Sequence, residues 1–133
     1  MCGTGHQEGD RNGEVIAQGQ TVPTASLPWN PHPKFAGVSL RHLVTGANTG
    51  GRLSLHHVRI DPGCAIGDHS HAGMVEIHDV IAGCGTCTLE SSAIPYAPGM
   101  VGVMPADRVH RVRRERTASS CSQPSPRPLS EET

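Results

Sequence analysis

The chain is short, nearly uncharged overall and poor in aromatic residues, and these properties exclude several functional classes. It has 133 residues, a formal net charge of -1, and one residue each of tryptophan, tyrosine and phenylalanine. Nucleic acid is not an expected partner, because there is no basic field to attract it and no aromatic platform on which bases could stack. No apolar run is long enough to cross a membrane, and no signal-like segment follows Met1. We therefore expect a one-domain cytoplasmic protein.

The five cysteines form an odd set without an export signal, which argues against a disulfide framework and favours reduced thiols. Cys84 and Cys87 have half of the spacing of a zinc ribbon, but no second such pair completes a tetrahedral site. We interpret this pair as a turn followed by a small buried side chain.

In chain order, residues 1–22 are polar and glycine-rich and are expected to form a flexible N-terminal arm. Residues 23–37 contain four prolines, which favour extended, irregular chain anchored by Trp29 and Phe35. From Val38 onward, apolar and polar residues alternate in short stretches, as they do in strands.

Turn signals then recur at short intervals, at residues 46–51, 61–63, 72–73, 82–85, 97–99 and 105–107. Many short strands with hairpin-sized connections are typical of an antiparallel sandwich or barrel, so we predict an all-β domain over residues 23–116. Residues 117–133 are rich in serine, proline and threonine and are expected to be disordered. A closing strand after the domain is therefore not expected.

One constellation of residues points to a metal. His69 and His71 are two residues apart, so they project from the same face of a strand; Glu76 follows five residues later, and His110 follows a turn at Pro105. Three imidazoles and one carboxylate suit a divalent transition metal better than calcium or magnesium. The ion could be iron, manganese, nickel or zinc.

The runs GCAIGDHSHAGMVEIHDVIAG and PGMVGVMPADRVH resemble the two sequence motifs of the cupins. In the second run, Asp107 stands where the family usually has glycine, and Arg114 stands where asparagine is common. An aspartate at such a turn is tolerated because it can adopt left-handed backbone conformations. The resemblance implies a small jelly-roll β-barrel, metal ligands at His69, His71, Glu76 and His110, and a homodimer.

Two further residues are candidates for catalysis. His78 lies two residues beyond Glu76 and therefore faces the same side of the strand, where it could orient a ligand or act as a general acid or base. Tyr96 precedes the turn at residues 97–99 and could donate a proton or a hydrogen bond.

Two functions of different class follow. The first is a metal-dependent enzyme, of the isomerase, lyase or dioxygenase type, acting on a small polar metabolite. The second is a non-catalytic cupin that binds a small ligand, or senses metal or oxidation for a partner protein. A pocket filled by Met74, Met100 or Met104 would favour the second, whereas a solvent path to the metal would favour the first.

Overall fold

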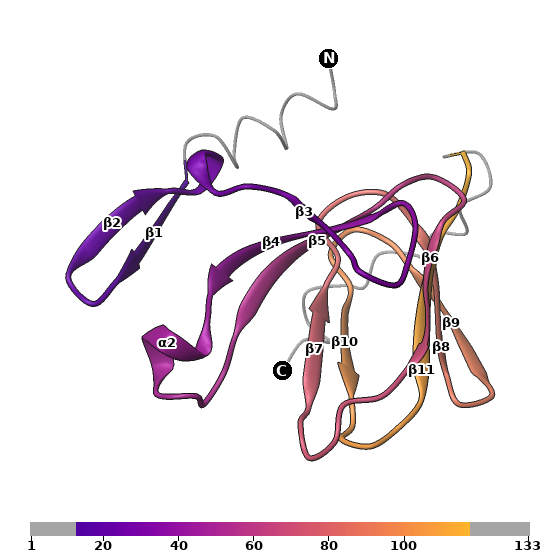
Figure 1. The fold of residues 1–133 in the computed structure, drawn as a ribbon. Helices are drawn as coiled ribbons and strands as arrows, with labels where there is room; N and C mark the ends of the chain where they lie inside the picture. Colours follow the sequence, from indigo (N-terminus) through magenta and orange to yellow (C-terminus); the bar gives the residue numbers. More distant parts are fainter. Residues whose placement is uncertain (1–12, 118–133) are drawn as a thin grey trace, which may run out of the picture. The chain divides into compact units, whose positions relative to one another are not determined.

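The computed structural model describes residues 13–117. The first part of the predicted flexible arm, residues 1–12, and the predicted disordered tail from residue 118 lie outside the described residues, as does the question of a closing strand. The chain divides after Ile60 into two compact units, which we call unit 1 and unit 2 and describe separately (Figure 1). The predicted domain of residues 23–116 includes parts of both units and stays a prediction.

Unit 1 contains a hairpin, a three-stranded antiparallel sheet of order β3-β4-β5, and two short helical turns. Its elements are β1 (Glu14–Ala17), β2 (Gln20–Pro23), the 3-10 turn η1 (Thr24–Ser26), β3 (Asn30–Pro31), β4 (Val38–Val44), α2 (Gly46–Thr49) and β5 (Leu55–Ile60).

The β1–β2 hairpin lies in the segment for which we expected a flexible arm. Val15 pairs with Val22 and Ile16 with Thr21, and the two residues between the strands, Gln18 and Gly19, have φ angles of 52° and 76°. Two consecutive left-handed residues make the tight turn whose twist matches that of paired strands. The polar composition of this stretch concealed that turn, and the structure therefore corrects the prediction for residues 14–22.

Trp29 anchors the proline-rich segment, as the sequence predicted. The guanidinium carbons of Arg41 and Arg59 lie 4.5 and 4.3 Å from the centre of its ring, and the ring of His57 stacks at 6.3 Å. The positive guanidinium groups are attracted to the electron-rich faces of the indole, so the contact holds the segment against β4 and β5.

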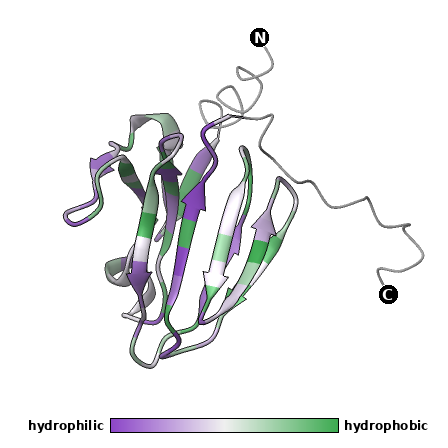
Figure 2. Ribbon diagram, turned by 90° about the vertical axis from the view of Figure 1, so that its right-hand side faces the viewer, coloured by the Kyte–Doolittle hydropathy of each residue, from purple (hydrophilic) through white to green (hydrophobic). Residues whose placement is uncertain are grey.

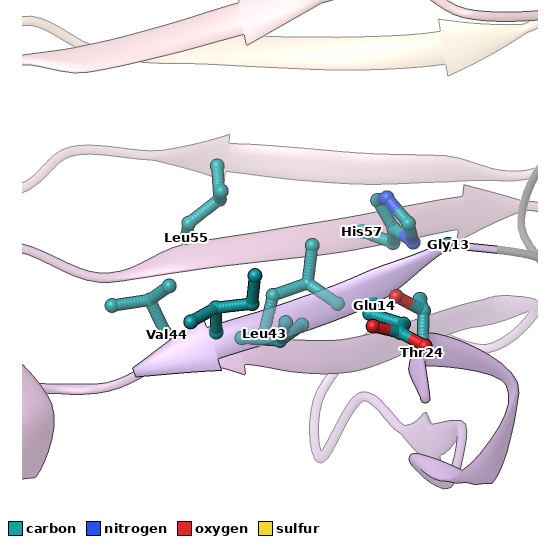
Figure 3. A pocket seen from close by; sticks show the side chains of 9 residues that line it. Gly13, Glu14, Thr24, Leu43, Val44, Leu55 and His57 are labelled. Carbon is teal, nitrogen blue, oxygen red and sulfur yellow. The ribbon is translucent and has the colours of Figure 1, made fainter. Parts of the chain in front are cut away.

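A hollow also lies in unit 1, lined by residues from β1, β4 and β5, among them Glu14, Leu43, Leu55 and His57, together with Thr24 (Figure 3). None of the four predicted metal ligands lines it. All four predicted metal ligands lie in unit 2.

The described part of unit 2, residues 61–117, has six strands: β6 (Ala65–His69), β7 (Glu76–Asp79), β8 (Gly85–Leu89), β9 (Ser92–Tyr96), β10 (Val101–Met104) and β11 (His110–Arg114). They form a four-stranded sheet of order β6-β11-β8-β9 and a two-stranded sheet of β10 and β7 (Figure 1). All the pairs are antiparallel, and hydrophobic and hydrophilic bands alternate along the strands (Figure 2). The predicted all-β, antiparallel fold class is confirmed.

The core of unit 2 is small. Cys87, Tyr96 and Met104 are buried, and Val80, Leu89, Ile94 and Val112 pack against them.

Cys87 and Cys64 are free thiols, as expected, but Cys84 is disulfide-bonded. The expectation of reduced thiols is therefore wrong for Cys84. The distance between Cα atoms in the folded chain decides which cysteines pair, and the spacing of cysteines in the sequence does not reveal that distance.

The helical segments within residues 13–117 are far too short to span a bilayer.

Gly85 offers a test of the strand packing. It pairs with Tyr96 on one side and Arg114 on the other, and a Cβ atom there would overlap the carbonyl oxygen of Arg113 and lie 2.9 Å from its carbonyl carbon. Because backbone cannot move aside cheaply, Gly85→Ala should lower the free energy of unfolding by about 1–3 kcal/mol. Urea titration followed by circular dichroism measures this.

The matched control is Gly46→Ala, since a Cβ there would make only an ordinary contact, 3.5 Å from the Cα of Gly51. Equal unfolding midpoints for the two variants would contradict the close approach of β8 and β11.

Candidate metal centre

The four predicted ligands come together in unit 2. Strand β11 pairs antiparallel with β6, which places His110 directly opposite His69, and His71 follows β6 while Glu76 begins β7. The ligand atoms of these four side chains all lie within 4.8 Å of one another. The sequence spacing therefore did predict a real cluster of donors.

A β-bulge helps to orient the side chain of His69. Between the pairs His110 with His69 and Val112 with Ile66, β11 advances two residues (110 to 112) while β6 advances three (69 to 66). An extra residue on one strand bends it and turns a side chain away from regular alternation. The ring of His69 lies 4.2 Å from that of His110 and 5.0 Å from that of His71, measured between centroids.

Backbone carbonyls determine which nitrogen of each ring faces the cluster. The Nδ1 of His69 lies 2.8 Å from the carbonyl oxygen of Gly67, and the Nδ1 of His110 lies 3.2 Å from that of Arg108. A carbonyl oxygen only accepts hydrogen bonds, so each Nδ1 carries the proton and each Nε2 carries a lone pair. This is how metal-binding histidines are commonly oriented.

The Nε2 atom of His110 is the decisive one. The side chain is 1% exposed, and no group within residues 13–117 forms a hydrogen bond with this nitrogen. The nearest carboxylate oxygen, Oε1 of Glu76, is 3.7 Å away. Burying an acceptor without a partner costs about 1–3 kcal/mol, and a metal ion would supply that partner. The residues present therefore fit a divalent transition ion.

Glu76 carries the negative charge of the cluster. Its two carboxylate oxygens lie 2.5 Å from the Nε2 atoms of His71 and His78. Burial by itself would raise the pKa of Glu76, but the hydrogen bond from His78 and attraction to His78, His71 and His110 outweigh it and lower the pKa to about 2. Burial lowers the pKa of His110. Both effects keep these side chains in the forms that bind metal.

His78 and Tyr96, the two candidates for catalysis, are joined to the cluster in a chain. His78 Nδ1 lies 2.9 Å from the hydroxyl oxygen of Tyr96, and its Nε2 contacts Glu76. Burial, followed by a hydrogen bond with Cys87, raises the pKa of Tyr96, so the hydroxyl keeps its proton. The consistent arrangement is that Tyr96 donates to His78 and His78 donates to Glu76.

Gly102 is a positioning residue that the sequence analysis missed. It pairs with His78 across β10 and β7, and a Cβ there would overlap the Tyr96 hydroxyl and lie 3.0 Å from its ring carbon Cζ. Its φ angle is not in the left-handed region, so the close approach of Tyr96 requires the glycine. The signal in the sequence was a lone glycine inside the apolar strand Val101–Met104.

Asp107 also has a structural role that the sequence did not reveal. Its φ angle is 67°, in the left-handed region expected for the residue that replaces glycine in the second motif. Its carboxylate accepts a hydrogen bond of 3.0 Å from the backbone N–H of Gly73, and its own N–H donates to the carbonyl oxygen of His71 at 3.1 Å. Asp107 therefore ties the second motif to the loop that carries His71.

The family model described as "Cupin domain" matches residues 56–121, which include all four ligand positions. The chain belongs to the cupin superfamily.

Solved structures agree with this assignment. The cupin resembles a predicted oxalate decarboxylase from Thermotoga maritima, with a TM-score of 0.62 and 20% identity over 68% of this chain and 83% of that chain. It also resembles KdgF from Halomonas sp., with a TM-score of 0.59 and 20% identity over 68% of this chain and 79% of that one.

The polyketide cyclase RemF from Streptomyces resistomycificus is similar as well, with a TM-score of 0.56 and 17% identity over 68% of this chain and 66% of that chain. At these identities the likeness is one of fold, and it confirms the predicted jelly roll. No curated protein matches the chain.

A double-mutant cycle tests the role of Gly102. In the wild-type background, Gly102→Ala should displace the Tyr96 hydroxyl, leave the His78 nitrogen without its partner and cost about 1–3 kcal/mol of stability. In a Tyr96→Phe background the hydroxyl is already absent, so the same substitution should cost clearly less. Urea titration gives the stabilities, and NMR of the His78 ring nitrogens reports the hydrogen bond directly.

Gly102→Ala and Tyr96→Phe should perturb the His78 ring signals in the same way. Additive losses of stability, or an unchanged His78 spectrum in both variants, would show that Gly102 does not make room for this contact.

Proposed function

We propose that this cupin is a metal-dependent enzyme acting on a small polar metabolite, with the ion held by His69, His71, Glu76 and His110. The observation that carries the proposal is the buried Nε2 of His110, which has no hydrogen-bond partner within residues 13–117 and faces three other donors. Four protein ligands leave about two positions of a six-coordinate ion open to a metabolite. When bound, the ion would polarise an oxygen of that metabolite.

Access to the donors supports an enzyme over a closed binding protein. The side chains of His71 and Glu76 are 37% and 32% exposed, so small molecules can reach one side of the cluster. Met104 is buried against Cys87, and Met74 is 60% exposed. Because His71 and Glu76 remain exposed to this extent, none of Met74, Met100 and Met104 closes off that side of the cluster.

The Tyr96–His78–Glu76 chain supports acid–base chemistry. In this proposal the imidazolium form of His78 gives its Nε2 proton to the metabolite, on the side where Glu76 meets the solvent, and the neutral ring that remains, protonated at Nδ1, takes a proton back at Nε2. The buried Tyr96 hydroxyl, hydrogen-bonded to Nδ1, orients the ring and keeps its own proton. Because a proton-transfer pair stands beside the donors, we favour an isomerase or lyase over a dioxygenase.

Metal content tests the site. Wild-type protein, purified and incubated separately with manganese, ferrous iron, nickel or zinc and then desalted, should retain metal by elemental analysis, whereas His69→Ala should retain much less. Loss of a residue that merely orients a ligand weakens binding by about 10–100-fold, so loss of a ligand should weaken it at least as much.

His32→Ala is the matched control, because His32 Nδ1 is engaged by the backbone N–H groups of Lys34 and Phe35 at 3.0 and 3.3 Å. If wild type and His69→Ala retain equal amounts of every metal, the site is not a metal centre.

Proton transfer tests the catalytic role of His78. Metal-loaded protein in heavy water, with a panel of small hydroxy and keto acids and sugar acids, should exchange C–H protons or convert at least one compound, followed by proton NMR. His78→Ala should slow this by about 10²–10⁴-fold while keeping its metal, as is typical when a general acid or base is lost.

Tyr96→Phe should slow it less, because the imidazole that moves the proton is still present. A His78→Ala protein that keeps full activity, or a metal-loaded wild type without activity on the whole panel, would contradict the proposed enzyme.

A further inference from the structure

A second pair of histidines meets in unit 1. His42 on β4 and His56 on β5 are direct partners across the antiparallel pair, and their Nδ1 atoms lie 2.8 Å apart. The two rings are nearly perpendicular, at 83°, with centroids 4.8 Å apart. Both side chains are exposed, and neither belongs to the donor cluster of unit 2.

The ring of His56 is held in place from its far side. Its Nε2 lies 3.0 Å from the hydroxyl oxygen of Ser54, which leaves Nδ1 as the nitrogen that faces His42. The ladder between β4 and β5 is irregular from His42 onward, because its register shifts between His42 and Val44. Such bulges commonly re-aim side chains at functional positions.

The distance between the two nitrogens limits what can lie between them. Two lone pairs at 2.8 Å would repel, and two N–H groups would clash, so in the free protein one nitrogen must donate a proton to the other. A metal ion can replace that proton. With imidazole nitrogens at about 2.0–2.1 Å from one ion, two of them lie roughly 2.9 Å apart at the right angle that nickel and copper prefer, and roughly 3.3 Å apart at the tetrahedral angle of zinc. The observed 2.8 Å is close to the first value, and a small separation of the two rings gives the second.

We propose that His42 and His56 form a second metal site, independent of the centre in unit 2, for a divalent ion of the zinc, nickel and copper group. The two Nδ1 atoms bind the ion, Ser54 orients His56 from outside, and water fills the other positions. Calcium and magnesium are excluded, since both require oxygen ligands. With only two imidazole ligands from the described residues, this site binds more weakly than a centre of three histidines and one glutamate.

Zinc titration of the full chain tests the proposal, with Zn²⁺ alone as the probe and a chromogenic chelator as competitor. His42→Ala and His56→Ala should each bind one equivalent less than wild type and keep the tighter class of sites. His69→Ala should lose a tighter equivalent and keep the weaker one. His32→Ala, which removes a half-buried histidine whose Nδ1 is already engaged by backbone, should titrate like wild type.

The His69→Ala variant distinguishes the two sites. If this variant titrates like wild type while the His42 and His56 variants do not, the centre in unit 2 is refuted and the His42–His56 site is not. The second site is refuted if either His42→Ala or His56→Ala binds as much zinc as wild type. Circular dichroism confirms that each variant is folded.

NMR of the imidazole nitrogens gives a second, independent reading on the unmutated protein. Zinc should shift the Nδ1 signals of both His42 and His56, and Ser54→Ala should weaken that binding by severalfold. Shifts confined to Nε2, or to one of the two rings, would overturn the proposal.

Discussion

The antiparallel pairing of β11 with β6 is the constraint on which the candidate centre depends. It places His110, from the second sequence motif, directly opposite His69, from the first. Side chains alternate between the two faces of a strand, so a slip of one residue would carry His110 to the other face and disperse the cluster. Pairing of β11 with β8 on its other side, where His110 lies opposite Leu89, holds the strand in this register.

The buried Nε2 of His110 has no hydrogen-bond partner among residues 13–117, and such burial costs free energy unless an ion supplies the partner. The proton of His110 is engaged by the carbonyl oxygen of Arg108, so Nε2 cannot become a donor and turn to another acceptor without losing that bond. The folded protein therefore holds the lone pair of His110 Nε2 in a buried position before any ion binds. Such preparation is what a metal centre needs, since the ligand does not have to reorganise when the ion arrives.

The hydrogen-bonded chain from Tyr96 through His78 to Glu76 adds orientation to this cluster. It combines β9 and β7, which belong to different sheets of unit 2, and passes close to the backbone of Gly102. Against the effect of burial, the hydrogen bond from His78 and the neighbouring imidazoles lower the pKa of Glu76 to about 2, so at neutral pH its negative charge is available to an ion while His78 orients the carboxylate. In unit 1, the two exposed imidazoles of His42 and His56 face each other across β4 and β5.

The sequence by itself determined the alternation of short strands, and with it the fold class, and it singled out His69, His71, Glu76 and His110 as one group of donors. Those features depend on the period of a strand and on local spacing, which can be read along the chain. Only the tertiary structure decided which nitrogen of His110 lacks a hydrogen-bond partner within the described residues, that Tyr96 reaches His78, and that Gly102 makes this possible. It also revealed the β1–β2 hairpin, the disulfide-bonded state of Cys84 and the facing pair of His42 and His56. The physical reason is that these contacts join residues on different strands. The register between strands is set by packing and hydrogen bonding across the sheet, and the sequence of a single strand does not contain that information.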